Sequence, residues 1–349
     1  MIEIVKDHDF SGWRDYCLRH PFRQYSHLPQ WANALAEVYA LPAFFLIARQ
    51  AGTPEHACGV LPLLHFAPPD APARLISLPY TDGAGILADT PAAGNELLAA
   101  ALELAGKLAV SHLELRQYGE AMFNPGLFAP DWVHQAHAFK VGLQRPLPDA
   151  TAALWDGLPA KVRNQVRKAW RCGCVGRVGG AELLDDFYAV FSENMRDLGS
   201  PTHPPAVFDR LLAGNGGEAR CLVIYSKDTP VAASLVFASG DTLCNPWAAS
   251  LRRYRPVCAN MLLYWLMLCH GVRRGCTRFD FGRSTYGTPT CRFKAQWGAK
   301  MVPLTWHVLS RPSQRWHPAQ ETLVVESWKH LDLAASRLQG PAIRRWISL

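Results

Sequence analysis

The feature of this sequence that most constrains its fold is a weak internal repeat. The segment NELLAAALELAGKLAVSHLEL, which begins at Asn95, aligns without gaps with NMLLYWLMLCHGVRRGCTRFDF, which begins at Asn260. Leucines recur at positions 97/262 and 98/263, and a glycine recurs at 106/271. A Thr-Pro pair also recurs, at 53–54 and 229–230. Such self-similarity predicts two tandem copies of one folding unit.

Each copy is predicted to be an α/β unit with a mixed sheet. In the first half, helical periodicity covers 22–39 and 95–110, and strands are expected at FFLIARQ, CGVLPLLHF, LISLPY, HLELR and 132–141. In the second half, helices at 158–170, 182–198 and 205–212 precede a hairpin of CLVIYS and VAASLVFA. A chain of 349 residues that is 49% hydrophobic can fill two cores.

The boundary between the copies is expected near two prolines, at 146 and 148, which precede a new helix. We therefore predict an N-terminal domain at 1–148, a C-terminal domain at 149–310 that is the active half, and a helical tail at 311–349. The tail has an apolar and basic pattern that Gly340-Pro341 interrupts. It is expected either to pack on the second domain, to dock on a partner, or to make a peripheral membrane contact.

Targeting and metal-binding signals are weak. The first residues, MIEIVKDHDFSGW, carry acids where a secretion signal needs a basic start, and the apolar run 257–269 is shorter than the ~18 to 20 residues of a membrane span. Ten scattered cysteines form no CxxC pair, and thirteen histidines show no ligand spacing. We expect a cytoplasmic protein, with the inner face of the membrane as an alternative, and no metal.

Positive charge is concentrated in two segments of a chain whose formal net charge is +7. Residues 161–177 contain six basic residues and no acid. Residues 245–298 contain a single acid, Asp280, and most of their basic residues fall at the ends of expected elements, where ligands are often bound. An anionic ligand is therefore predicted. The basic residues of 245–298 are Arg252, Arg253, Arg255, Arg273, Arg274, Arg278, Arg283, Arg292 and Lys294.

The two copies differ in the loop before the repeated helix. In the first copy this loop, DGAGILADTPAAGN, carries Asp82 and Asp89 without a basic residue, whereas SLRRYRPVCAN in the second copy carries Arg252, Arg253 and Arg255. A helix N-terminus offers free N–H groups and the positive end of its dipole, so arginines directly before it are suited to a phosphate group. We predict the donor site there.

Several motifs resemble the FemAB-like acyltransferases, which are double GNAT-fold proteins. They are the apolar helix start ANMLLYW, the strand end DFG at 280–282, and FK followed by WGA at 293–299. RNQVRKA, FYAVFSENMRDLG and FDFGRST are similar to FemAB-related proteins associated with exosortase and PEP-CTERM exopolysaccharide systems. The resemblance covers about residues 20–310. It implies two tandem GNAT-like (acyl-CoA N-acyltransferase fold) domains.

The resemblance also implies transfer of an aminoacyl or acyl group to an amine, with aminoacyl-tRNA as the donor of the peptidoglycan-bridge enzymes. The usual acetyl-CoA loop of GNAT enzymes, Gln/Arg-x-x-Gly-x-Gly/Ala, is missing from SLRRYRPVCAN, which has no glycine. No tightly bound cofactor is expected. The donor is predicted to be an aminoacyl-tRNA, with an acyl-CoA as the alternative.

Two residues are the catalytic candidates. Lys294 matches the lysine of the family's Phe/Tyr-Lys motif and is expected to stabilise the oxyanion, unless it is a surface lysine on a short helix. Asp280 is expected either to accept the proton of the amine or to form a structural ion pair with Arg278 or Arg283.

The remaining candidates are expected to bind substrate. Asn260 has an alternative as a helix N-cap, matching Asn95, and Trp247 and Tyr254 have an alternative in the core. A loop of Arg283, Ser284, Tyr286 and Thr288 is expected either to recognise the acceptor or to be an ordinary solvent-exposed loop. The full set of substrate-binding candidates is Trp247, Arg252, Arg253, Tyr254, Arg255, Asn260, Arg283, Ser284, Tyr286 and Arg292.

The sequence thus predicts an acyltransferase of FemAB type that acts on an amine acceptor in cell-envelope or exopolysaccharide metabolism. A CoA-dependent GNAT N-acetyltransferase is one alternative. A non-catalytic scaffold of the exopolysaccharide or protein-sorting machinery is another.

Overall fold

The computed structural model describes residues 2–4, 10, 12–50, 53–128, 131–214, 218–313 and 325–348. The chain divides into two compact units. Unit 1 comprises 1–142, 302–321 and 346–349, and unit 2 comprises 143–301 and 322–345. Sequence reasoning placed the boundary at 148/149 and assigned everything after 310 to a separate tail.

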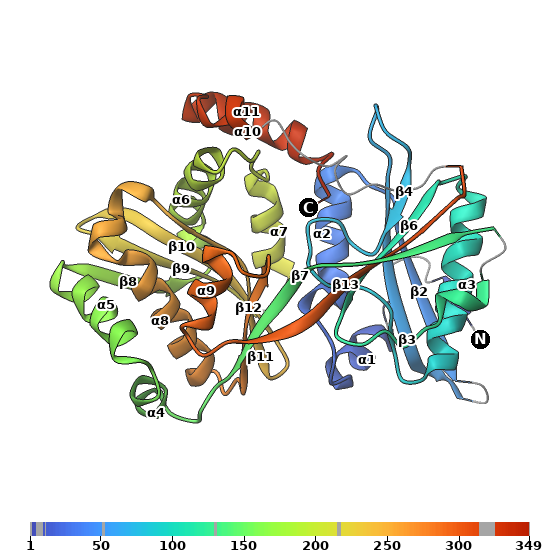
Figure 1. Cartoon of the computed structure of the whole chain (residues 1–349), viewed down its shortest axis with the longest axis horizontal. Coiled ribbons are helices and arrows are strands. Elements are labelled where there is room, and N and C mark those ends of the chain that lie inside the picture. Colours follow the sequence, from blue (N-terminus) through green and yellow to red (C-terminus); the bar gives the residue numbers. More distant parts are fainter. Residues whose placement is uncertain are drawn as a thin grey trace. The chain divides into compact units, whose positions relative to one another are not determined.

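In unit 1 the helix of the first repeat, α3, packs against the strands of a sheet (Figure 1). Its strand order is β1-β2-β3-β4-β6-β13-β7. β4 and β6 are parallel neighbours, so the chain needs a crossover between them, and α3 provides it. The elements are β1 (Ile2–Ile4), α1 (Trp13–Arg19), η1 (Tyr25–His27), α2 (Pro29–Tyr39), β2 (Ala43–Gln50), β3 (Thr53–Phe66), β4 (Arg74–Ile76), β5 (Leu87–Ala88), α3 (Pro91–Lys107), β6 (His112–Tyr118), η2 (Pro125–Phe128), β7 (Val133–Pro146) and β13 (Lys300–Ser310).

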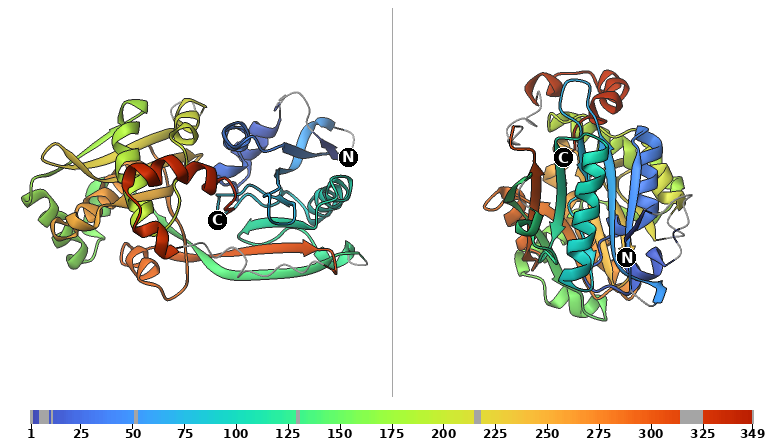
Figure 2. Two further views of the ribbon diagram at one scale, coloured as in Figure 1. Left: turned by 90° about the horizontal axis from the view of Figure 1, so that it is seen from above. Right: turned by 90° about the vertical axis from the view of Figure 1, so that its right-hand side faces the viewer.

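The core of unit 1 forms because α3 buries an apolar face on β2 and β3. Leu97, Leu98 and Ala101 are fully buried there, at spacings that place them on one side of a helix. The N-terminus of α3 is capped by Thr90, whose hydroxyl accepts a hydrogen bond from the Ala93 N–H at 3.2 Å. β13, although late in the chain, pairs antiparallel with β6 in this unit (Figure 2).

Unit 2 repeats the arrangement, with α8 as the crossover between parallel strands β11 and β12. Its strand order is β12-β11-β10-β9-β8, and the last residues of β7 lie beside β12. The elements are α4 (Thr151–Asp156), α5 (Ala160–Arg171), β8 (Cys174–Gly179), η3 (Ala181–Leu183), α6 (Leu184–Asp197), α7 (Pro205–Gly214), β9 (Ala219–Ser226), β10 (Thr229–Ser239), β11 (Thr242–Ser250), η4 (Arg252–Val257), α8 (Ala259–Arg273), β12 (Arg278–Ser284), α9 (Pro289–Ala295), α10 (Val325–Lys329) and α11 (Leu333–Arg344).

The central strand of unit 2 is covered on both faces. In β10 every residue from Val231 to Ser239 is buried, a continuous pattern typical of a strand between two layers. α6 and α8 both pack on β10, and α5 packs on α8. Residues 245–250 and the first turn of α8 are therefore held on a rigid core.

The Thr-Pro repeat marks the same place in the two units. Thr53 pairs with Gln50 at the start of β3, and Thr229 pairs with Ser226 at the start of β10, so each Thr begins the second strand of a hairpin. The prediction of two mixed α/β units is confirmed. The strand expected at CGVLPLLHF, which begins at Cys58, starts earlier in the structure, because β3 already begins at Thr53; residues 51–52 lie outside the described part.

The tail contains two helices that pack on α6. Arg337 donates a hydrogen bond from Nε to the Ser192 hydroxyl at 2.8 Å, and Arg344 donates from Nε to His203 Nε2 at 3.2 Å. The predicted interruption at Gly340-Pro341 is wrong, because α11 continues through both residues. Among the tail alternatives, packing on the second domain is observed for α11. The segment 314–324 lies outside the described residues.

Candidate active site

The site begins where the two parallel strands of unit 2 stop pairing. β11 and β12 are in register from Thr242/Arg278 to Cys244/Asp280. β11 then continues to Ser250 alongside β10, while β12 continues to Ser284. Asp280 is thus the last β12 residue that pairs with β11, and the residues after it are free of that partner.

Asp280 is buried, with 3% of its surface exposed. Its Oδ1 accepts a hydrogen bond from the Gly282 N–H at 2.7 Å, and its Oδ2 accepts one from the Gln144 side chain at 2.9 Å. Gly282 has φ +70°, a conformation that a glycine adopts without strain, which lets the strand turn back on the carboxylate. The structural alternative for Asp280 was an ion pair with Arg278 or Arg283; of these two, Arg278 pairs with Asp241 at 3.1 Å.

Lys294 is also buried, with 7% exposed, and is therefore not the surface lysine of the alternative interpretation. It lies on α9, and its Nζ donates a hydrogen bond to the main-chain oxygen of Arg283 at 2.6 Å. α9 begins at the N-cap Thr288, whose hydroxyl accepts from the Cys291 N–H at 3.3 Å. This contact brings Lys294 to the end of β12, next to Ser284.

Ser284 is buried, and its hydroxyl has no hydrogen-bond partner within the described part of the chain. Buried hydroxyls are nearly always paired, so this one is available for a ligand. The predicted acceptor loop needs correction: Arg283 and Ser284 are the last residues of β12, and Thr288 caps α9. Tyr286 is 72% exposed.

An aromatic cluster supports this end of the unit. Tyr264 of α8 stacks on Phe281 at a centroid distance of 5.8 Å and on Trp297 at 6.0 Å, and it meets Phe293 edge-on at 4.9 Å. Burial raises the pKa of Tyr264 to about 12, so its phenol stays protonated at neutral pH. The cluster fixes α8, β12 and α9 against one another.

The arginines before α8 form the 3-10 turn η4 and have exposed side chains. Arg253 pairs with Glu193 of α6, and its guanidinium lies 5.4 Å from the centre of the Tyr254 ring. Arg252 and Arg255 have no side-chain partner among the described residues. Further along, Arg292 donates to the Gly287 oxygen at 2.5 Å. The positive charge available to a ligand is therefore smaller than the sequence count suggests.

The N-terminus of α8 has no side-chain cap. The N-cap is Cys258, in the left-handed conformation with φ 59°, and the helix begins at Ala259. The N-cap alternative for Asn260 is therefore wrong, and so is its match with Asn95, which lies inside α3 and accepts from the Asn124 N–H at 2.7 Å. Asn260 lies in the first turn of α8, half-buried.

Trp247 does not take part in the site. It is 9% exposed and packs edge-on against Phe208 at 5.0 Å and His203 at 5.7 Å, so the core alternative holds. Sequence reasoning missed Gln144, which contacts Asp280 from 136 positions away, and Arg145, which donates to the Trp297 oxygen at 2.5 Å. No local motif marks either residue.

Comparison with known proteins identifies the fold. Residues 159–295 match the acetyltransferase (GNAT) domain family. The crystal structure of FemX superposes with a TM-score of 0.69 at 14% identity, over 88% of this chain and 96% of that one. A tandem GNAT protein from the clavulanic acid biosynthesis pathway superposes with a TM-score of 0.54 at 16% identity, over 90% of this chain and 100% of that one. The C-terminal domain of a putative lysylphosphatidylglycerol synthetase from Agrobacterium fabrum superposes with a TM-score of 0.53 at 11% identity, over 80% of this chain and 86% of that one.

Unit 2 therefore carries a GNAT acetyltransferase domain, and the fold of the chain is similar to that of a solved tandem GNAT protein. The protein is an acyltransferase of this fold, which binds an acyl donor and an amine acceptor. None of the curated proteins matches the sequence. Within the described residues no helix is long and apolar enough to span a membrane, and no three His, Cys, Asp or Glu side chains there form a metal-binding group.

Proposed function

We propose that unit 2 transfers an aminoacyl group from an aminoacyl-tRNA to an amine acceptor in cell-envelope metabolism, as the FemAB resemblance implies. The observation that carries the proposal is how the η4 turn uses its main chain. The N–H of Tyr254 donates to the Leu251 oxygen at 3.0 Å, that of Cys258 donates to the Arg255 oxygen at 3.1 Å, and Pro256 has no N–H. Two N–H groups at the turn are thus already used and a third position has none, while the exposed arginine side chains remain directed to solvent and are suited to a phosphate.

A second observation favours a long polyanion as the donor. α5, which packs on α8, exposes Lys161, Arg167, Lys168 and Arg171, while Val162 and Val166 are buried. Its Trp170 is 45% exposed and stacks on Trp155 at 5.5 Å. Extended positive surface with exposed aromatic rings suits a nucleic acid backbone, whose binding is driven by phosphate contacts. The names of two structural neighbours, FemX and lysylphosphatidylglycerol synthetase, agree with aminoacyl transfer.

In the proposed reaction Lys294 of α9 and Asp280 of β12 have one role each. The neutral amine attacks the ester carbonyl carbon, the new C–N bond forms, the C–O bond to the ribose breaks, and the amine proton ends on the ribose hydroxyl. Lys294 stabilises the oxyanion; a well-placed donor of this kind lowers the barrier by about 3 kcal/mol. Asp280 accepts the amine proton in passing, since a buried carboxylate at the end of the paired part of β12 can act as a base for an amine bound beside it.

A CoA-dependent N-acetyltransferase is the second candidate, favoured by the match of residues 159–295 to the acetyltransferase (GNAT) domain family. The two donors are distinguished by binding. We expect the purified full chain to bind charged tRNA, measured by fluorescence anisotropy, and to give no heat with acetyl-CoA in calorimetry. Micromolar acetyl-CoA binding without tRNA binding would overturn the proposed donor.

Variants that replace arginines test where the tRNA binds. Arg252→Ala/Arg255→Ala should weaken tRNA binding at least tenfold and reduce the dependence of log Kd on log salt by about 2, one per lost phosphate contact. Arg273→Ala, compared with each single variant Arg252→Ala and Arg255→Ala, is the matched control, because it removes one exposed arginine at the other end of α8. Fifteen helical residues separate these ends by about 22 Å. Equal losses in Arg273→Ala and in the single variants would mean that charge acts without a defined site.

A further inference from the structure

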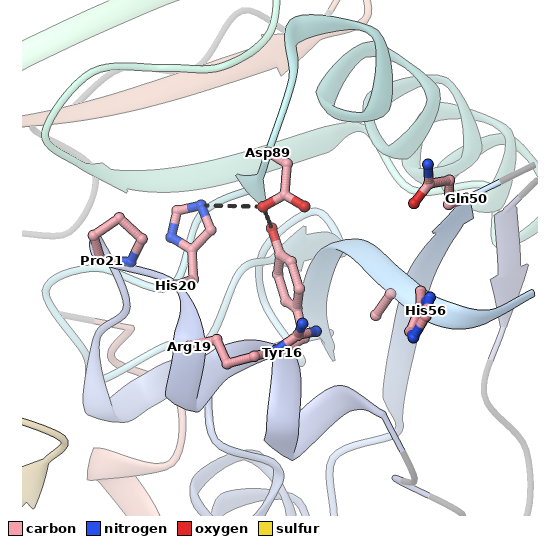
Figure 3. A pocket seen from close by; sticks show the side chains of 8 residues that line it. Tyr16, Arg19, His20, Pro21, Gln50, His56 and Asp89 are labelled. Carbon is pink, nitrogen blue, oxygen red and sulfur yellow. Dashed lines mark hydrogen bonds and ion pairs between the residues drawn. The ribbon is translucent and has the colours of Figure 1, made fainter. Parts of the chain in front are cut away.

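Unit 1 contains a pocket of about 290 Å³ that is formed by α1, the facing ends of β2 and β3, and the residue that follows β5 (Figure 3). Its polar lining comes from Tyr16, Arg19, His20, Gln50, His56 and Asp89. The volume lies at the lower end of the usual range for small-molecule sites, roughly 300 to 1,000 Å³, so the pocket admits a small metabolite rather than a nucleotide.

Asp89 is held rigidly in this pocket. Its main-chain N–H donates to the Cys58 oxygen at 3.0 Å, and its Oδ1 accepts a hydrogen bond from the Tyr16 hydroxyl at 3.1 Å. Burial and the neighbouring carboxylate raise the pKa of Tyr16 above its usual range, so this phenol acts as a donor at every physiological pH. The Asp89 side chain remains 50% exposed, and Oδ2 has no partner among the described residues.

The charge of Asp89 is not neutralised by its neighbours. His20 Nε2 lies 3.9 Å from Oδ1, while His20 Nδ1 accepts a hydrogen bond from the Phe22 N–H at 3.2 Å and thus carries no proton. Burial lowers the pKa of His20, which keeps the ring neutral with its proton on Nε2. No Lys or Arg in the described part of the chain forms an ion pair with Asp89. Figure 3 shows Tyr16 and His20 both directed at the same carboxylate oxygen.

We propose that this pocket binds a small primary amine of the α-amino acid class, with the ammonium group on Asp89 Oδ2. A fixed, half-exposed carboxylate with one free oxygen is suited to an ammonium group, which donates up to three hydrogen bonds. The exposed guanidinium of Arg19 lines the same pocket and is suited to the carboxylate of such a ligand. Asp89 belongs to the first-copy loop that has no arginines, so the two repeats have come to present opposite charges.

Every residue that lines the pocket belongs to unit 1. The inference therefore does not depend on the transfer reaction proposed for unit 2. If that reaction failed in every assay, amine binding at Asp89 would still be expected.

The test compares three probes on the full chain by calorimetry and saturation-transfer NMR: L-alanine, L-alaninamide and N-acetyl-L-alanine. The first two carry the ammonium group and the third lacks it. We expect L-alanine and L-alaninamide to bind at least tenfold more tightly than N-acetyl-L-alanine. Equal or tighter binding of N-acetyl-L-alanine, or no binding of any probe, would overturn the proposal.

Two variants assign the binding to the pocket. Asp89→Asn removes the charge but keeps an oxygen for the Tyr16 hydroxyl, and it should weaken L-alaninamide binding at least tenfold. Tyr16→Phe releases the carboxylate and should weaken it less. The matched control is Asp70→Asn, which removes one exposed negative charge elsewhere in unit 1 and should leave the affinity unchanged. Unchanged affinity in both Asp89→Asn and Tyr16→Phe would contradict the site.

Discussion

The ammonium group of Lys294 donates a hydrogen bond of 2.6 Å to the main-chain oxygen of Arg283, and so joins α9 to the end of β12. Replacing Lys294 by methionine removes the ammonium group but keeps a side chain of similar size, so the effect on catalysis can be distinguished from an effect on folding. We expect Lys294→Met to lower kcat about 10²- to 10³-fold, because one oxyanion donor is lost, with donor affinity little changed.

The structural cost of Lys294→Met should be about 1 kcal/mol, the loss of one partly buried hydrogen bond. The matched control is Lys300→Met, which replaces an exposed lysine at the first residue of β13, still within unit 2, and should change neither kcat nor stability. Steady-state kinetics and urea unfolding measure the two effects. Wild-type turnover in Lys294→Met would remove the oxyanion role.

Asp280 is predicted to act on the amine proton. Asp280→Asn keeps an oxygen for the Gly282 N–H, and the Gln144 amide can rotate to meet the new NH₂ group, so the fold should be retained. We expect kcat to fall between about 10²- and 10⁴-fold, the usual contribution of a general base. The loss should be measured with the acceptor amine at saturation.

Asp241→Asn is the comparison for this variant. Asp241 accepts hydrogen bonds from Thr277 at 2.8 Å and from Arg278 at 3.1 Å, so its loss should lower stability and spare turnover. If Asp280→Asn behaves in the same way, its carboxylate is structural and the amine loses its proton without a protein base.

Ser284 supplies a buried hydroxyl that has no partner within the described residues. If it binds substrate, Ser284→Ala should raise KM several-fold, about 1 kcal/mol for a neutral hydrogen bond, with stability unchanged or slightly increased. Ser239→Ala is the control, because Ser239 at the end of β10 is also buried with an unpaired hydroxyl. Equal KM values in the two variants would exclude Ser284 from substrate recognition.

Features set by residues close together in the sequence were predicted better than features set by contacts between residues far apart in it. The repeat at Asn95 and Asn260 predicted the duplicated strand-helix-strand unit, because hydrophobic periodicity reports local structure. The N-cap role offered for Asn260 by its match with Asn95 was wrong, since capping depends on where a helix begins: Cys258 and Thr90 occupy the N-caps instead.

The charge pattern was also only partly informative. Glu193, Glu218 and Asp241 lie outside the basic segment in sequence, yet they pair with Arg253, Arg274 and Arg278 in the fold. Counting charges along the sequence cannot detect such neutralisation, because each pair joins residues that only the tertiary fold brings together. Arg252 and Arg255 keep their charge available, and the pocket around Asp89 follows from a tertiary contact with Tyr16 that no motif marks.

Stability at acid pH should be limited by His27 of η1. Its Nδ1 accepts a hydrogen bond from the Gln24 N–H at 3.0 Å, and its Nε2 lies 2.9 Å from the Gly85 oxygen, so the neutral ring satisfies both neighbours. Burial lowers the pKa of His27 to about 4. Protonation would place a second donor against the Gln24 N–H.

Because this folded pKa lies below the unfolded value, the unfolded chain binds the proton first, and stability is lost as pH falls from about 6.5 towards about 4. The loss at pH 5 should be about 2 kcal/mol for this group. Urea unfolding at pH 7.5 and pH 5 should show a smaller pH effect in His27→Gln than in wild type. His56→Gln, at an exposed histidine, should keep the wild-type difference; an unaltered difference in His27→Gln would rule out the assignment.

The central claim is that η4, with Arg252 and Arg255, and the end of β12, with Lys294 beside it, together perform aminoacyl transfer. It is tested most directly by following a radiolabelled acyl group from the donor to the product. The full chain is incubated with a low-molecular-mass cell extract as the amine source and with either tRNA charged with radiolabelled amino acids or radiolabelled acetyl-CoA. Mild alkali then hydrolyses aminoacyl esters and leaves amides intact. We predict alkali-stable label from charged tRNA only, lost in Arg252→Ala/Arg255→Ala and in Lys294→Met; stable label from acetyl-CoA, with none from tRNA, would contradict the account.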